Sequence, residues 1–361
     1  CNIHITKSVK LIKPSILRAI LFGTACMGAV KYVPENMKVE LSLKVPGNNA
    51  VNYKLHPDKL ENSYFDYEWR SDNKLPITVF HKVEERDSCM RLTVQLTAAQ
   101  DVYFNYRQLL STGYRHDNCQ FYMPGFWYRR NLRSPKKAPS FHTSDSWLVR
   151  EDRLSAPLTG IFSEKEKRFM TVNRLDDFSM DALATHKEGE IILSGKTSLG
   201  FTGFENQQGI AMLSFGFPYR EAPKSYIRKL TLAPEVEAFQ LMKKGESVLL
   251  TWEIMESGAD DFSDFIQHTW EHCYDTYAPK PVENSYSIAD MKQVLSCFFV
   301  NSLVDNQPLV YNSGIHLKVS DCERNGQAEV GFIGRVLLNA FNAWEYGWQS
   351  NREELKVSVR K

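Results

Sequence analysis

The sequence lacks the marks of several protein classes. Its seven cysteines include no C-x-x-C pair, so their spacing indicates neither a structural zinc site nor a disulfide framework. Forty-four Lys and Arg stand against 43 Asp and Glu, and a net charge of +1 gives no basic excess to attract phosphates. No apolar run reaches the roughly 18 residues of a membrane span. We therefore expect neither nucleic acid nor a stable membrane span.

Motifs of common enzyme classes are also missing. The sequence contains no G-x-S-x-G nucleophile elbow, no P-loop lysine and no strand-linked G-x-G-x-x-G. His268 and His272 are one helical turn apart, but the glutamate that directly follows the first histidine of a zincin motif is absent. We expect these histidines to be solvent-exposed or paired with carboxylates, and we expect no metal and no cofactor.

The remaining composition is that of a globular protein. With 361 residues, 43% hydrophobic and 24% charged, the chain has room for about two domains. Aromatic residues make up 12% of it. Such residues pack the interior of β-sandwiches, and they also stack on flat ligand faces, so the composition leaves both uses open.

Residues 31–256 have the pattern of a large, supersandwich-like antiparallel β-sandwich. Short apolar runs with period 2 alternate with turn signals such as Pro46-Gly47. The expected strands are residues 39–45, 77–83, 90–96, 102–109, 168–173, 190–193, 211–217, 236–241 and 247–254. So many strands exceed one small sheet, and we expect two sheets face to face.

Near residue 257 the apolar spacing changes to three and four, which predicts helices. One helix is expected from about Phe262 to Tyr277, after an acidic first turn, and it ends at Pro279. A second begins near Ser287, with Asp290 in the acidic position of a capping box. A third runs over about residues 331–348, where apolar residues including Trp344 share one face. The fold class is therefore multidomain, β then α.

Both ends of the chain suggest interruption. Residues 1–30 contain a basic cluster, a short apolar run and small residues before Cys26, a pattern of bacterial export signals or of a misplaced start. We expect export to the periplasm or the outer membrane. The 104 residues after 257 (361 minus 257) have room for about four helices with their loops. We interpret residues 257–361 as a helical linker and the beginning of a truncated helical domain.

The densest polar and aromatic segment is residues 121–157, interpreted as a long loop without a convincing strand. Trp127 and Tyr128 offer flat faces for a sugar ring, and the charged and amide side chains around them can bind hydroxyls or a carboxylate. A purely structural use is equally open, in which the aromatics plug the sandwich edge and residues 150–153 form surface ion pairs. Glu151 and Asp152 are adjacent, so in an extended chain they point to opposite sides and cannot flank one glycosidic bond.

The large sandwich is followed by helices, and two segments are distinctive, residues 122–131 (YMPGFWYRRN) and residues 330–347 (VGFIGRVLLNAFNAWEYG). In this domain order and in these segments the chain resembles the six-hairpin, (α/α)6-toroid glycosidases of Bacteroidetes polysaccharide-utilisation systems. The first is similar to loops that such sandwiches send toward the toroid. The toroid needs twelve helices, so only its beginning would be present.

This resemblance implies a glycoside hydrolase, or a fragment of one, that acts on a complex polysaccharide or oligosaccharide. It assigns no catalytic residue. The expected substrate-binding residues are Trp127, Tyr128, Arg129, Asn131, Glu151 and Asp152. Two alternatives stay open: a non-catalytic carbohydrate-binding protein, and a polysaccharide lyase of the same architecture.

Overall fold

The computed structural model describes residues 34–360 with internal gaps, and it divides the chain into two compact units, Cys1–Ala278 and Pro279–Lys361. The gaps are residues 60–65, 87–88, 132–137, 177–187, 229–230, 281–282, 284–285, 302, 305–309, 312–314, 318–321 and 325–332. The expected export signal in residues 1–30 lies outside the described residues. Among the helices that are described, none is long and apolar enough to span a membrane.

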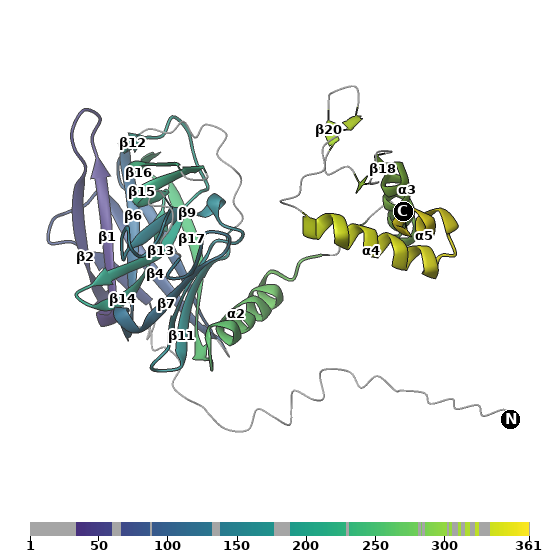
Figure 1. Cartoon of the computed structure of the whole chain (residues 1–361). Coiled ribbons are helices and arrows are strands. Elements are labelled where there is room, and N and C mark those ends of the chain that lie inside the picture. The colour runs from purple at the N-terminus through teal and green to yellow at the C-terminus, as the bar shows by residue number, and fades with distance from the viewer. Residues whose placement is uncertain are drawn as a thin grey trace. The chain divides into compact units, whose positions relative to one another are not determined.

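The first unit is built on two large antiparallel sheets (Figure 1). Sheet I has the order β2-β1-β6-β14-β13-β9. Its strands are β1 (Met37–Lys44), β2 (Val51–Lys59), β6 (Val102–Arg115), β14 (Ile210–Phe217), β13 (Phe201–Gln207) and β9 (Trp147–Arg150). The second half of β2 leaves β1 and pairs with the first strand of the other sheet, so one strand joins the two.

Sheet II has the order β2-β3-β4-β5-β17-β11-β10-β7-β8. Its further strands are β3 (Asp66–Arg70), β4 (Ile77–Arg86), β5 (Cys89–Ala98), β17 (Ser247–Gly258), β11 (Arg168–Arg174), β10 (Leu158–Ser163), β7 (Cys119–Met123) and β8 (Trp127–Arg129). A smaller group adds β12 (Gly189–Ile192), β15 (Arg220–Arg228) and β16 (Thr231–Met242). There β12 and β16 pair in parallel.

The inner faces of the two sheets form one core. Trp252 of sheet II packs against Tyr106 and Phe215 of sheet I, with ring centroids 6.4 and 5.1 Å apart. Alternate residues along each strand enter this core, as period-2 patterning predicts. Each strand expected from the sequence has a counterpart in the structure, and the β-rich first part of the chain is confirmed.

A buried polar network lies inside this core. The Tyr106 hydroxyl donates to Oε1 of Gln108 at 2.7 Å and lies 2.9 Å from Nε2 of His81. Since the hydroxyl has one proton and gives it to Gln108, His81 must donate from Nε2. Desolvation lowers the pKa of His81 to about 3, so the imidazole is neutral at physiological pH.

Helix α2 (Phe262–Tyr277) covers the outer face of sheet II, beside β11 and β17 (Figure 1). Asp261 caps it by accepting hydrogen bonds from the backbone N–H of Ser263 and Asp264, and Ala278 ends it in the left-handed conformation. Phe265 enters the sheet above Gly160, where an added Cβ would come within 2.5 Å of the ring. The change from strand to helix near 257 is therefore not the border between compact units, because α2 packs on the sandwich.

The segment 121–157 contains more regular structure than the sequence suggests. It includes the last part of β7, all of β8 and β9, and the 3-10 helix η3 (Glu151–Arg153). The interpretation of this segment as one long strandless loop is wrong. Its strands are short, and β9 is buried on both faces, so neither length nor alternation marks them.

The second unit combines helices with short strand pairs. Its helices are α3 (Ile288–Asn301), α4 (Ile333–Gln349) and α5 (Glu353–Arg360), and its strands are β18 (Leu303–Val304), β19 (Val310–Tyr311), β20 (Ile315–Leu317) and β21 (Cys322–Arg324). Ser287 and Asp290 exchange hydrogen bonds at the start of α3, which confirms the expected capping box. The strands depart from the all-helical expectation.

In residues 340–349 of helix α4, the bulky face that the sequence predicts to be buried stays exposed. Gly347 lies against Leu355 of α5, where an added Cβ would be 3.0 Å from that of Leu355, and Ala343 is buried. Trp344 stays 38% exposed, so its expected burial is wrong. Gly347 lets the two helices approach closely, and Trp348 meets α5 through Lys356, whose Nζ lies 4.6 Å from the ring centroid.

Candidate functional site

Trp127 belongs to the core. Its side chain is 0% exposed and packs against Trp147 and Phe204, with ring centroids 5.8 and 5.1 Å away. The indole N–H donates to the carbonyl of Arg129 at 3.0 Å. A fully covered indole presents no face to a ligand, so the prediction of Trp127 as a sugar-stacking residue is wrong.

Glu151 is also enclosed. Its Oε2 accepts hydrogen bonds from Nη1 of Arg174 at 2.7 Å and from the backbone N–H of Gly200 at 2.8 Å. Burial raises its pKa, against the opposing effect of the Arg174 charge. Removal of the Glu151 or the Arg174 side chain would leave the charge of the other one unpaired inside the protein. Glu151 therefore has a structural role in this fold, and the prediction that it binds substrate is wrong.

Asp152 and Asn131 are occupied by local contacts. Both carboxylate oxygens of Asp152 accept from Arg150, at 2.6 and 2.7 Å. Asn131 donates from Nδ2 to the carbonyls of Phe126 and Pro139 and accepts at Oδ1 from the backbone of Tyr128. The amide thus fixes the end of the β7–β8 hairpin, and its polar atoms already have protein partners.

The β7–β8 hairpin directs Tyr128 outward. Residues Tyr122 and Tyr128 are paired across the strands, as are Met123 and Trp127, so the two tyrosines share the outer face while Met123 and Trp127 face the core. Gly125 makes the turn at a φ of 80°, a conformation that glycine adopts without steric cost. Of the predicted residues, Tyr128 and Arg129 are exposed, and the Arg129 guanidinium lies 5.1 Å from the ring centroid of Phe262.

Tyr128 is continuous with aromatic residues of helix α2. Its ring lies edge-on to Tyr122, with centroids 5.5 Å apart, and the Tyr122 hydroxyl accepts a hydrogen bond from Nε1 of Trp270 at 2.8 Å. Trp270 and Tyr274 are one helical turn apart. Tyr128, Trp270 and Tyr274 are 52%, 38% and 66% exposed, and we call these three residues the aromatic surface.

Sequence reasoning missed two of its members. The spacing of three and four places Trp270 in the apolar stripe of the helix, which favours a buried indole, and the same spacing gives no sign of a role for Tyr274. The structure buries Phe265, Thr269 and Cys273 at the centre of that stripe and leaves Trp270 at its margin. A helix that packs on a flat sheet buries only a narrow stripe of side chains. Aromatic residues at the margin of that stripe are therefore candidates for exposed positions.

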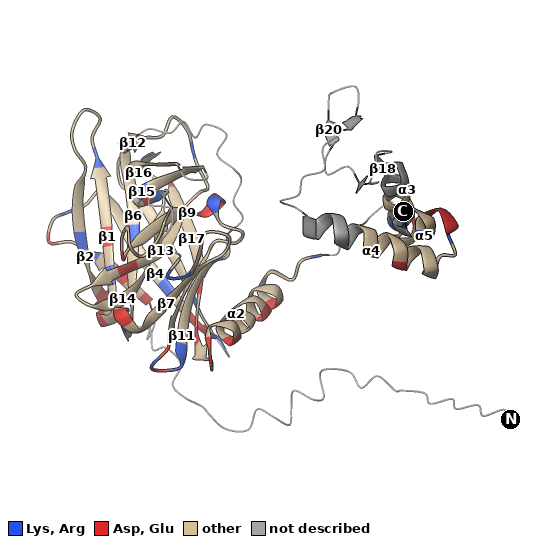
Figure 2. Ribbon diagram, in the orientation of Figure 1, with Lys and Arg blue, Asp and Glu red and all other residues tan. Residues whose placement is uncertain are grey.

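Acidic and amide groups surround the aromatic surface. Trp270 and Tyr274 line a surface depression of about 440 Å³ together with Gln267, Glu271 and Asp275. Gln267 donates to Glu271 across one helical turn at 3.1 Å. Helix α2 contains no Lys or Arg, and its acidic positions are coloured red on the ribbon in Figure 2. The depression therefore has a negative character.

The two histidines of α2 pair with carboxylates, as the sequence analysis expects. Nε2 of His268 is 3.4 Å from Asp264, and Nε2 of His272 is 2.8 Å from Oε1 of Glu253. Glu253 is also bound by Arg91, and these hydrogen bonds outweigh its burial and lower its pKa to about 2. It is therefore ionised at neutral pH.

No family model matches the sequence, and no curated protein matches it. Among solved structures, a polysaccharide lyase is similar at 13% identity over 65% of this chain and 27% of the lyase, with a TM-score of 0.32. A GH36 α-galactosidase from Geobacillus stearothermophilus is similar at 10% identity over 64% of this chain and 31% of that one, with a TM-score of 0.34.

A putative aldose 1-epimerase from Escherichia coli K12 is similar at 8% identity, over 60% of this chain and 79% of that one, with a TM-score of 0.32. The match spans about a quarter of the lyase and about a third of the galactosidase. All three proteins are named for activities on carbohydrates. Similarity at this level does not establish an activity for this chain.

Proposed function

We propose that this chain is part of a carbohydrate-active protein and that its aromatic surface binds a glycan. The observation that carries the proposal is the arrangement of three exposed rings: Tyr128 and Trp270 both contact Tyr122, and Tyr274 lines the same depression as Trp270. Adjacent exposed aromatics on a soluble protein mark an interaction site, because covering them from water is favourable. Sugar rings have apolar faces that can lie on such side chains.

The geometry also supports a role in positioning. The hydrogen bond from Trp270 to Tyr122 holds the indole in one orientation, so binding a ligand costs less side-chain entropy. Gln267, Glu271 and Asp275 supply acceptors for sugar hydroxyls beside the rings. The same carboxylates repel a uronate, so the proposed ligand is a neutral glycan. This favours glycan binding and hydrolysis over a lyase acting on acidic polysaccharides.

Hydrolysis is the finer part of the proposal. The order of sandwich and then helices supports a glycoside hydrolase of the six-hairpin type, with the helices of residues 279–361 belonging to its toroid. Export to the periplasm or the outer membrane is proposed with it, supported by the basic and apolar pattern of residues 10–26. In this proposal the sandwich holds the polysaccharide, and catalysis belongs to the toroid.

The binding proposal is tested with the full chain and a panel of neutral and acidic polysaccharides in affinity gel electrophoresis. Tyr128→Ala and Tyr274→Ala should each weaken binding of the preferred neutral glycan about five- to tenfold, the equivalent of about 1 kcal/mol of stacking. Tyr286→Ala is the matched control, because Tyr286 is an exposed tyrosine outside the aromatic surface. Absence of binding to every glycan, or equal affinity of all three variants, would contradict the proposal.

A further inference from the structure

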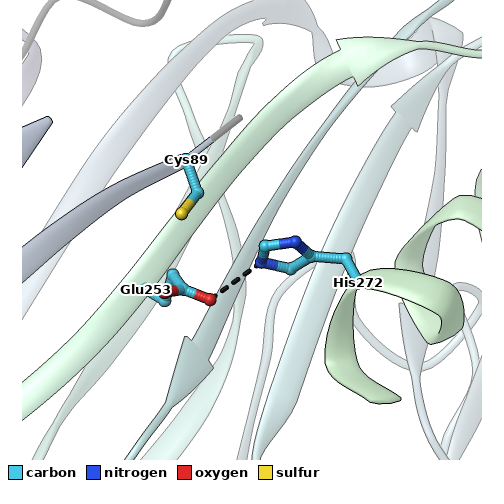
Figure 3. A group of neighbouring side chains, drawn as sticks. All are labelled: Cys89, Glu253 and His272. Atoms are coloured by element: carbon cyan, nitrogen blue, oxygen red, sulfur yellow. Dashed lines mark hydrogen bonds and ion pairs between the residues drawn. The ribbon is translucent and has the colours of Figure 1, made fainter. Parts of the chain in front are cut away.

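Three side chains with metal-binding atoms meet between sheet II and helix α2. Cys89 begins β5, Glu253 lies within β17, and His272 projects from α2 toward both (Figure 3). Cys89 is paired with Met255 in the sheet, and Met255 and Glu253 lie on the same face of β17, so thiol and carboxylate face the helix together.

The three groups are close enough to share one ion. The Cys89 sulfur, a carboxylate oxygen of Glu253 and a ring nitrogen of His272 all lie within 4.8 Å of one another. Zinc takes bonds of about 2.0–2.3 Å to such atoms, so its ligands stand about 3.3–3.8 Å apart in a tetrahedron. Small side-chain adjustments bring the three atoms to this spacing, with Glu253 Oε1 exchanging its hydrogen bond with His272 for the metal.

We propose that Cys89, Glu253 and His272 form a zinc site. Zinc would bind the Cys89 sulfur as a thiolate, and the thiol proton would be released to the solvent. A thiolate, an imidazole and a carboxylate are the three ligand types that zinc uses in proteins, and a thiolate disfavours magnesium and calcium. His272 is partly exposed, which leaves the fourth position open to water. The local spacing of the sequence hides this site, because each ligand comes from a different element.

Neighbouring residues would hold the carboxylate in place. Arg91 donates to Glu253 Oε2 at 3.2 Å, the oxygen not assigned to the metal, and Thr276 donates to Oε1 at 3.0 Å. Such outer partners orient a ligand and affect metal affinity by about 10- to 100-fold. A bound ion would connect β5, β17 and α2, so it would fix the helix that carries Trp270 and Tyr274.

The test uses the full chain, stripped with a chelator, reloaded with zinc and dialysed. The expected content is about one zinc per chain by elemental mass spectrometry, and addition of zinc should raise the melting temperature. Cys89→Ser and His272→Gln should weaken zinc binding at least about a hundredfold, beyond the loss typical of an outer partner. His268→Gln and Cys297→Ser are matched controls, one helical turn away and in α3, and should bind as the parent does.

Cobalt provides a second measurement on the unmodified chain. A tetrahedral cobalt–thiolate site gives a near-ultraviolet charge-transfer band and intense visible absorption, and the band should vanish in Cys89→Ser but persist in Cys297→Ser. Circular dichroism checks that each variant is folded. A parent chain without a cobalt–thiolate band, or zinc retention equal in Cys89→Ser and Cys297→Ser, would overturn the proposal whether or not glycan binding is found.

Discussion

The interior of the sandwich and helix α4 of the second unit place their bulky aromatic residues in opposite ways. In the sandwich, Trp127, Trp147 and Trp252 are fully enclosed between the sheets. In the second unit, Phe341 and Trp348 are 55% and 53% exposed, and Trp344 lies between them on the same helix. The two sheets of the sandwich bury these tryptophans between them. Among the residues that the structure describes, the aromatic side chains of α4 stay exposed.

The difference shows that the period-2 pattern of a strand and the amphipathic pattern of a helix do not predict burial equally well. A period-2 strand in a sandwich finds its partner sheet within the same unit, so its apolar face is buried. The pattern of an amphipathic helix predicts only that one face is apolar, and that face is buried only if another element packs against it. In the proposed toroid, the exposed side of α4 would pack against further helices.

The largest effect is expected at the centre of the sandwich. Trp127→Ala removes a fully buried indole and should cost about 3–5 kcal/mol of unfolding free energy, because a cavity remains between Trp147 and Phe204. Urea denaturation of the first unit, followed by tryptophan fluorescence, measures this. A loss below about 1 kcal/mol would show that Trp127 is not part of the sandwich core, and the contrast with α4 would fail.

Acid should weaken the sandwich through its buried histidine. The pKa of His81 is about 3 in the folded chain and about 6.5 in the unfolded chain. Between these values the imidazole binds a proton in the unfolded chain but not in the folded chain. Stability should therefore be complete above pH 6.5 and fall by up to about 1.4 kcal/mol per pH unit toward pH 3. In His81→Gln this part of the slope should disappear, and an unchanged slope would refute the assignment.

A smaller effect is expected where α2 meets the sheet. Gly160→Ala places a methyl group against Phe265 and should cost about 1–3 kcal/mol through overpacking. Gly195→Ala is the control, because its added Cβ meets no atom within 4 Å. Thermal unfolding of both variants compares them. Equal stabilities would show that α2 is not part of the sandwich unit.

The smallest effect is expected on the exposed face of α4. Trp344→Ala should reduce local stability by about 1 kcal/mol or less, because substitutions on exposed surfaces have small effects. Leu355→Ala, in the fully buried contact between α5 and α4, should cost about 2–5 kcal/mol. Amide hydrogen exchange within α4 separates the two, and a larger loss in Trp344→Ala would contradict the observed burial.

The period-2 pattern predicts β1, β4 and β5, which alternate between buried and more exposed residues, although it misses the short strand β3, which also alternates. It misses β10, because all six of its residues are buried and no alternation marks it. It also takes Trp127 for a ligand-stacking residue, although the order Tyr122, Met123, Trp127, Tyr128 encodes alternate faces of a hairpin. Recognising this requires the strand register, which composition does not give.

The candidate site is less predictable than the fold. Tyr128 and Arg129 could be selected because they lie in a polar, aromatic segment, and both are exposed. Trp270 reaches the same surface only because α2 docks on sheet II and its indole bonds to Tyr122. Contacts between residues 148 positions apart leave no local signal in one sequence.

The central claim, that the aromatic surface binds a glycan, is tested most directly by tyrosine footprinting. The full chain is nitrated with and without the glycan selected by gel electrophoresis, and the modified tyrosines are quantified by mass spectrometry. The glycan should protect Tyr128 and Tyr274 from nitration. Tyr286, which is exposed but not part of the aromatic surface, should be nitrated at the same rate with and without the glycan. Equal modification of all three tyrosines at saturating glycan would contradict it.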